Sequence, residues 1–189
     1  MKKHLFITVD GVDGVGKTTI SKLLAEELNA MYYKSPGKMF LEFKEKVESP
    51  LNVFGRYSFY RLAVQYDSDN IKKNLEACSV VSDRYIASTF VYHFVMDPDI
   101  GKIHNEIGIL KPDLAFLLIA STQVRDRRIS CRNESANWIE ENSILLDKIQ
   151  AAFLSLDLIV IDTDNLNPND IVNQILNFIK KNKNGNDEA

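Results

Sequence analysis

The stretch that decides the fold is Gly11-Val12-Asp13-Gly14-Val15-Gly16-Lys17-Thr18, which matches the pattern G-x-x-x-x-G-K-[ST]. A short apolar run, 4–10, precedes it, and apolar residues at helical spacing follow it up to Leu28. Glycines in such a turn let backbone N–H groups face phosphate oxygens, and the helix that starts there presents its positive end to the same anion. The segment therefore predicts a strand, a phosphate-binding glycine loop and a helix.

The remaining chain alternates between short apolar runs and helical patterns. Further strands are predicted at 31–34, 79–83, 113–120 and 157–161, and helices at 54–77, 87–96, 103–110, 123–131, 140–154 and 168–180. Strands that alternate with helices and are apolar almost throughout indicate a parallel sheet covered on both faces. The fold class is therefore α/β, with one domain over residues 1–180 and a polar, frayed tail over 181–189.

Composition excludes several classes of protein. The 189 residues are 45% apolar and 26% charged, as in one globular domain, and the net charge of −3 gives no basic excess for binding nucleic acid or membrane. The longest apolar run, 114–120, is far shorter than the roughly 20 residues of a membrane-spanning helix. The apolar stretch near the start is too short for the core of a signal peptide, so we expect a cytoplasmic protein.

Asp83 stands at the carboxyl end of the predicted third strand and Arg84 comes next, at the edge of the sheet where ligands bind. The carboxylate of Asp83 suits Mg²⁺, as does the hydroxyl of Thr18, and Arg84 can bind a phosphoryl group with two parallel hydrogen bonds. The alternative is a surface ion pair that caps the next helix. Together with the glycine loop, the pair favours phosphoryl transfer.

Four segments together resemble the thymidylate kinase family in content, order and spacing. They are 10–19 with the glycine loop, Pro36-Gly37, the segment 83–88 that reads Asp-Arg-Tyr-Ile-Ala-Ser, and Lys111-Pro112-Asp113. The resemblance runs from about residue 4 to residue 180. It implies a three-layer P-loop fold with a five-stranded parallel sheet and a helical lid at about 125–142. It also implies that ATP binds with Mg²⁺ at the loop residues Gly11, Val12, Asp13, Gly14, Val15, Gly16, Lys17, Thr18 and Thr19.

The same resemblance assigns residues to the acceptor. Asp13 would face the 3′-hydroxyl of the sugar, Phe59 would stack on the base, Arg84 would grip the acceptor phosphate, and Tyr92 would pack near the 2′ carbon. Without the resemblance, Phe59 and Tyr92 would be interpreted as core aromatic residues. The full acceptor set is Asp13, Lys34, Phe59, Arg84, Ser88, Thr89 and Tyr92.

The chain departs from the family pattern at two acceptor positions. Lys34 stands where the family has an arginine, which keeps the charge and loses the two-pronged hydrogen bonding. Ala63 stands where the family has an arginine that reads a base carbonyl, and Arg61 lies nearby on a different face of the predicted helix. These departures predict modest selectivity among bases.

The lid segment is rich in arginine, and the glycine loop carries no basic residue at positions 14 and 15. The family then supplies a catalytic arginine from the lid. Arg128 and Arg132 are the candidates because they share one helical face, and Arg132 matches the family pattern better. The alternative is a solvated basic helix.

These observations predict a nucleoside monophosphate kinase that moves the γ-phosphoryl group of Mg-ATP to a deoxynucleoside monophosphate, with dTMP the leading candidate. The expected catalytic residues are Asp13, Lys17, Arg84, Arg128 and Arg132. A kinase for a nucleoside or a different monophosphate, and a non-catalytic nucleotide-binding regulator, remain alternatives. The expected partners are ATP and a nucleoside monophosphate, without nucleic acid or membrane, and a homodimer is possible because the family is commonly dimeric.

Overall fold

The structure, a computed structural model, describes residues 4–48, 52–132 and 137–186. Its sheet has five strands, and every neighbouring pair is parallel, as predicted. The strand order is β2-β3-β1-β4-β5. The strands are β1 (Phe6–Asp10), β2 (Met31–Lys34), β3 (Val80–Asp83), β4 (Leu114–Ile119) and β5 (Ile159–Asp162).

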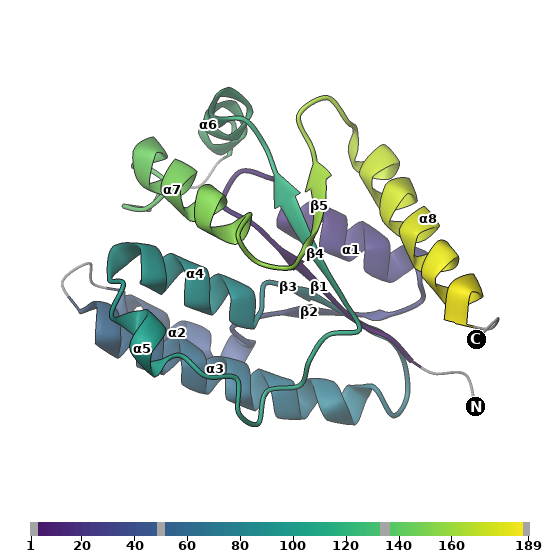
Figure 1. Cartoon of the computed structure of the whole chain (residues 1–189), viewed down its shortest axis with the longest axis horizontal. Helices are drawn as coiled ribbons and strands as arrows, with labels where there is room; N and C mark the ends of the chain where they lie inside the picture. The colour runs from purple at the N-terminus through teal and green to yellow at the C-terminus, as the bar shows by residue number, and fades with distance from the viewer. Residues whose placement is uncertain (1–3, 49–51, 133–136, 187–189) are drawn as a thin grey trace.

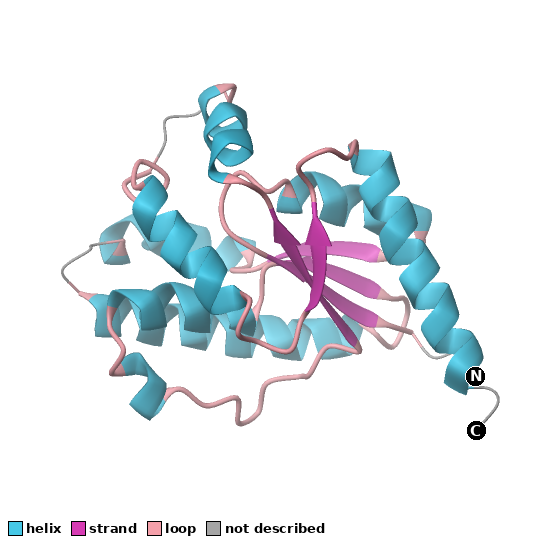
Figure 2. Cartoon of the chain, turned by 45° about the horizontal axis from the view of Figure 1, so that its top comes forward, coloured by secondary structure: helices cyan, strands magenta, loops and turns pink. Residues whose placement is uncertain are grey.

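Helices cover both faces of this sheet, which makes three layers (Figure 1 and Figure 2). Helices α1 and α8 pack together on one face, while α3, α4 and α7 lie on the other. The helices are α1 (Lys17–Glu27), α2 (Lys38–Val47), α3 (Val53–Asn74), α4 (Ile86–Met96), α5 (Ile100–Ile103), α6 (Thr122–Ser130), α7 (Ser143–Phe153) and α8 (Pro168–Asn186). None of them, within the described residues, is long and apolar enough to cross a membrane.

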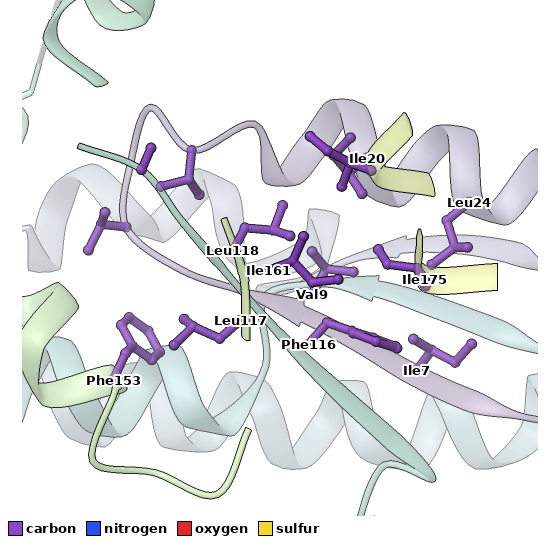
Figure 3. Close-up of a cluster of buried hydrophobic side chains, with 14 of the residues drawn as sticks. Ile7, Val9, Ile20, Leu24, Phe116, Leu117, Leu118, Phe153, Ile161 and Ile175 are labelled. Carbon is purple, nitrogen blue, oxygen red and sulfur yellow. The ribbon is translucent and has the colours of Figure 1, made fainter. Parts of the chain in front are cut away.

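The main hydrophobic core lies between the helices and the central strands (Figure 3). Leu24 of α1 and Ile175 of α8 are fully buried near one another, and Phe153 of α7 is fully buried beside β4. Strands β1 and β4 supply side chains to both faces, since Phe116 and Leu117 are adjacent and both completely buried. A sheet buried on both faces explains why these strands are apolar almost throughout.

The order of the strands determines which edge of the sheet carries the candidate functional residues. Strand β1 lies between β3 and β4, so the connections to the strands on its two sides run in opposite directions. In open α/β sheets, ligands bind at this point of reversal. Asp83 at the end of β3 pairs in register with Val9 of β1 and Lys34 of β2. The glycine loop, Asp83 and Lys34 therefore meet at one edge of the sheet.

The helix predicted at 103–110 is wrong. The structure has only the short α5, which ends at Ile103; His104 is in extended backbone, and Gly108 has a φ of 78° that an α-helix does not tolerate. The guanidinium of Arg61 also donates to the carbonyls of Asn105 and Ile107, at 3.0 and 2.9 Å. Those carbonyls are therefore satisfied by a side chain from α3 and not by a local helix.

The structure also differs in detail from the prediction in the tail and in the lid segment. Helix α8 continues beyond Lys180 to Asn186, and the side chain of Asn182 donates to the carbonyl of Phe178 at 3.0 Å. The predicted polar tail, 181–189, therefore overlaps α8 up to residue 186, and residues 187–189 lie outside the described residues. In the predicted lid, 125–130 belong to α6, 137–142 form a turn, and 133–136 lie outside the described residues.

Candidate active site

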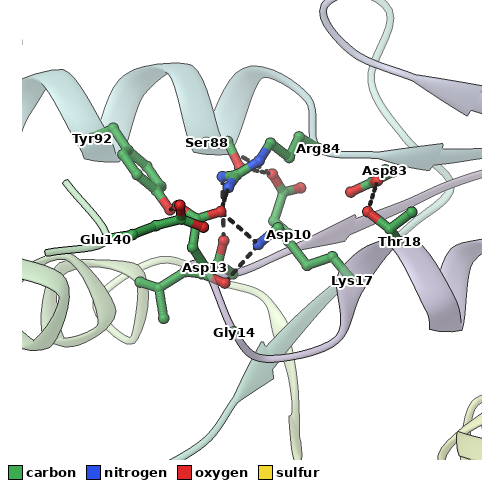
Figure 4. Close-up of polar contacts among 12 residues, drawn as sticks. Asp10, Asp13, Gly14, Lys17, Thr18, Asp83, Arg84, Ser88, Tyr92 and Glu140 are labelled. Atoms are coloured by element: carbon green, nitrogen blue, oxygen red, sulfur yellow. Dashed lines mark hydrogen bonds and ion pairs between the residues drawn. The ribbon is translucent and has the colours of Figure 1, made fainter. Parts of the chain in front are cut away.

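The glycine loop wraps around the side chain of Lys17 (Figure 4). Gly14 and Gly16 have φ values of 86° and 96°, which residues with a Cβ rarely adopt, and a Cβ on Gly14 would also lie 3.0 Å from the Arg125 backbone. The Nζ atom of Lys17 donates to the carbonyl of Val12 at 2.6 Å, and Lys17 is only 6% exposed. Burial lowers the pKa of Lys17 to about 8, because the site holds little water to stabilise the charged ammonium group.

Thr18 and Asp83 bring two oxygen ligands together where α1 begins. The hydroxyl of Thr18 donates to a carboxylate oxygen of Asp83 at 2.6 Å, and the phenol of Tyr32 donates to the same oxygen at 3.2 Å. Hydroxyl and carboxylate oxygens are ligands that Mg²⁺ prefers, with phosphate and water oxygens completing its coordination. The pair therefore fits the predicted metal site.

Asp13 connects the glycine loop to the other side of the site. Its carboxylate forms an ion pair with Arg84, accepts a hydrogen bond from the phenol of Tyr92 at 2.9 Å, and lies 3.6 Å from Nζ of Lys17 (Figure 4). Burial alone would raise the pKa of Asp13, but the charges of Arg84 and Lys17 outweigh it and hold that pKa well below the usual value. Arg84 is thus fixed by an ionised Asp13 and points at the loop.

Ser88 is positioned by a buried carboxylate at the end of β1. Its hydroxyl donates to Asp10 at 2.6 Å, and the backbone N–H groups of Tyr85 and Ser88 donate to the same oxygen at 3.2 Å. Asp10 therefore fixes the start of α4 to β1 and orients the helix face that carries the predicted acceptor residues.

A cavity of about 420 Å³ opens beside Asp13 and runs between α3, α4 and the turn that follows α6. Most of the predicted acceptor residues line it, together with the lid candidate Arg132. The predicted residues in its wall are Asp13, Lys34, Arg84, Ser88, Thr89, Tyr92 and Arg132.

Phe59 is not part of that wall. Its ring packs edge-on against Phe40, with 5.7 Å between ring centroids, while the next residue, Tyr60, lines the cavity. A one-residue offset turns a side chain by about 100° around a helix, which separates the two directions. Ala63 is fully buried outside the wall, and Arg61 binds the loop after α5, so neither lies where the base-reading residue was expected.

Several residues that line the cavity are not among those predicted from the sequence. Arg56 and Tyr60 are four apart on α3 and face the cavity together, so a helical phase one residue different from the assumed one would have found them. His93 follows Thr89 by one helical turn and shares its face. No local signal marks Glu48 or Glu140, which reach the cavity from the end of α2 and from the turn after α6.

The two lid arginines have different surroundings. Arg128 donates to Thr163 at 3.0 and 2.8 Å and to the carbonyls of Gly14 and Val15, each at 3.4 Å, so it supports the back of the glycine loop. Arg132 is 41% exposed in its side chain and forms an ion pair of 2.8 Å with Glu140 at the edge of the cavity. Of the two, Arg132 is among the residues that line the cavity, and Arg128 is not.

Comparison with known proteins identifies the family of this chain. The family model described as thymidylate kinase matches residues 9–175. A probable thymidylate kinase of Methanocaldococcus jannaschii is 31% identical over 95% of this chain and 98% of its own length. The thymidylate kinase of Wolbachia pipientis wMel is 28% identical over 93% of this chain and all of its own length.

Solved structures support the same fold at lower sequence identity. A thymidylate kinase from Candida albicans matches with a TM-score of 0.74 and 20% identity, covering 96% of this chain and 93% of its own. A deoxyadenosine kinase from M. mycoides matches with a TM-score of 0.68 and 18% identity, covering 94% of this chain and all of its own. The family model and the full-length relatives establish that this chain belongs to the thymidylate kinase family.

Proposed function

We propose that this protein transfers the γ-phosphoryl group of Mg-ATP to a deoxynucleoside monophosphate, with dTMP as the leading acceptor. Membership of the thymidylate kinase family makes it an ATP-dependent phosphotransferase. The observation that carries the proposal is that one cavity joins Asp13 of the glycine loop to Lys34 and Arg84, two cations suited to an acceptor phosphate. Donor and acceptor phosphates would thus meet over Asp13 and Arg84.

Catalysis in this arrangement rests on position and charge. Lys17 and the loop amides hold the outer phosphates of the donor, and Arg84 and Lys34 hold the acceptor phosphate in line with it. Asp13 keeps Arg84 directed at the junction through their ion pair. Arg132 approaches from the lid as charge moves between the phosphates, and lid closure excludes water that would otherwise hydrolyse ATP.

Mg²⁺ belongs to this proposal because Thr18 and Asp83 offer adjoining oxygen atoms at the donor end. When bound, the ion would neutralise charge on the donor phosphates. Action in the cytoplasm and assembly as a homodimer are further parts of the proposal and stay predictions.

A coupled assay of ADP formation across acceptors tests the proposal. Deoxynucleoside monophosphates, ribonucleoside monophosphates and the matching nucleosides are each supplied with Mg-ATP. We expect turnover with dTMP and none with thymidine. Turnover with nucleosides alone would replace the proposal with a nucleoside kinase, and ATP binding without turnover on any acceptor would indicate a regulator.

Arg84→Ala should weaken binding of the acceptor and leave binding of the donor nearly unchanged. Arg84 lies in the cavity wall and pairs with Asp13, so its removal takes a cation from the acceptor phosphate. We expect Kd for dTMP to rise about tenfold or more, the loss of one charge-assisted hydrogen bond, with Kd for ATP nearly unchanged. Calorimetry with each ligand separately is the measurement, and weakening of ATP alone would remove Arg84 from the acceptor site.

Asp67→Asn should weaken binding of the acceptor because Asp67 holds the segment 34–37. Asp67 is fully buried, and it accepts from the hydroxyl of Ser35 at 2.6 Å, the phenol of Tyr33 at 2.8 Å and the N–H of Gly37 at 3.1 Å. The asparagine amide keeps the shape of the carboxylate, but its nitrogen cannot accept a hydrogen bond as the carboxylate oxygen does. The segment 34–37, which carries Lys34, therefore loosens.

We expect KM for dTMP to rise about fivefold, with kcat and KM for ATP changed by less than about twofold. Asp69→Asn, on the exposed side of the same helix, is the control. Equal changes in both Michaelis constants would indicate general destabilisation and not a loop held for the acceptor.

A further inference from the structure

His93, which lines the cavity, has an unmatched hydrogen-bonding atom. It is 2% exposed, and it lies one turn after Thr89 on α4. Its Nδ1 is 2.6 Å from the carbonyl oxygen of Thr89, so Nδ1 carries the hydrogen and donates it. Its Nε2 is buried and has no hydrogen-bond partner among the described residues.

The imidazole is neutral, which decides what Nε2 can do. Burial lowers the pKa of His93 to about 4; the hydrogen bond to Thr89 and the charge of Glu48 oppose that shift, and the charge of Arg56 adds to it. Near pH 7, with Nδ1 protonated, Nε2 is therefore an acceptor only. A buried acceptor without a donor is costly, so a ligand N–H that reaches it gains the interaction.

Beside His93 the wall also holds an unmatched donor. Arg56 is 2% exposed and is held by Glu48, whose carboxylate is 2.9 Å from one terminal nitrogen, while Nε of Arg56 is buried without a partner among the described residues. The ring of Tyr60 lies 5.6 Å from that of His93, centroid to centroid. These lining residues thus combine an aromatic ring, a donor and an acceptor, and Asp13, Lys34 and Arg84 line the same cavity.

Resting on the proposed function, we propose that His93 determines base specificity by accepting a hydrogen bond at Nε2 from a ring N–H that stands beside a carbonyl group. Thymine and uracil present such an N–H at N3, and their neighbouring carbonyl oxygen takes the donor of Arg56. Cytosine carries a bare lone pair at N3, which would face the lone pair of Nε2. The pocket therefore selects thymine and uracil over cytosine, although Ala63 supplies no base contact.

The experiment compares dTMP with its N3-methyl derivative, in which that hydrogen is replaced. The variants are His93→Leu, which removes the acceptor, and His93→Gln, which keeps an acceptor at similar reach. We expect His93→Leu to lower kcat/KM for dTMP about tenfold or more, the effect of one lost buried hydrogen bond, and to change kcat/KM for N3-methyl-dTMP by less than about threefold. His93→Gln should recover part of the preference for dTMP.

His104→Gln serves as the matched control because His104 contacts Tyr57 outside the cavity wall. It should leave the ratio of the two specificity constants unchanged. The same ratio in wild type and His93→Leu would overturn the proposal, as would a wild type that uses dCMP as well as dTMP. Absence of turnover with any monophosphate in the wild type would instead overturn the proposed function.

A measurement on the wild type covers the case in which His93→Leu does not fold. With ¹⁵N-labelled histidine, the Nε2 resonance of His93 should shift when dTMP binds and stay in place when N3-methyl-dTMP binds. A resonance that dTMP leaves unchanged at saturation would show that Nε2 takes no hydrogen bond from the base.

Discussion

Lys17→Ala is expected to abolish nearly all phosphoryl transfer while the fold remains intact. Lys17 is buried at the glycine loop, with Nζ bound to the carbonyl of Val12 at 2.6 Å, so water cannot replace its charge beside the outer phosphates. We expect a loss of about 3 kcal/mol or more in transition-state stabilisation, which lowers turnover about 150-fold. Steady-state kinetics with saturating dTMP is the measurement.

Lys22→Ala is the control for that variant, because Lys22 lies on the exposed side of the same helix. Its turnover should match the wild type. If Lys17→Ala keeps more than about a tenth of wild-type turnover, a loss of only ~1.4 kcal/mol, then Lys17 does not hold the donor phosphates.

Arg132→Ala is expected to lower kcat about a hundredfold, with Michaelis constants for ATP and dTMP changed little, because an arginine that stabilises transferring charge acts mainly in the transition state. Gly14 and Val15 of the glycine loop carry no charge that could stabilise the transferring phosphoryl group. Arg132 lies at the edge of the cavity, and its described contact is with Glu140. That partner leaves its guanidinium free to turn when phosphates arrive.

Arg128→Ala separates catalysis from support of the loop. Arg128 binds Thr163 and the carbonyls of Gly14 and Val15, so its loss should raise KM for ATP and lower the thermal midpoint more than it lowers kcat. Near wild-type turnover in Arg132→Ala would argue against an arginine supplied by the lid. A kcat defect confined to Arg128→Ala would move the catalytic role to that residue.

The donor half of the site could be predicted from the sequence because its geometry is local. The glycine loop follows β1 directly, Asp83 ends β3 and Arg84 comes next, so the residues that meet at the sheet edge are those at strand ends. The structure places Thr18 against Asp83 and Arg84 against Asp13 in the way that this order requires.

The base end of the cavity could not be predicted with the same accuracy because it depends on the rotation of a long helix. The sequence prediction places Phe59 and Ala63 of α3 at the base. In the structure, Arg56 and Tyr60 of the same helix face the cavity. An offset of one residue in the resemblance is enough to turn the predicted face of this helix away from the cavity. Glu48 comes from another element, and nothing in the local pattern marks its approach.

The central claim is that phosphate moves from ATP to the phosphate of a deoxynucleoside monophosphate, and the position of a label tests it directly. The protein is incubated with Mg-ATP labelled at the γ-phosphate and with dTMP, and the products are separated and identified. The account predicts label in the terminal phosphate of dTDP, formed in step with ADP and lost in Lys17→Ala. Label released only as inorganic phosphate, or carried by a nucleoside and not by dTMP, would contradict it.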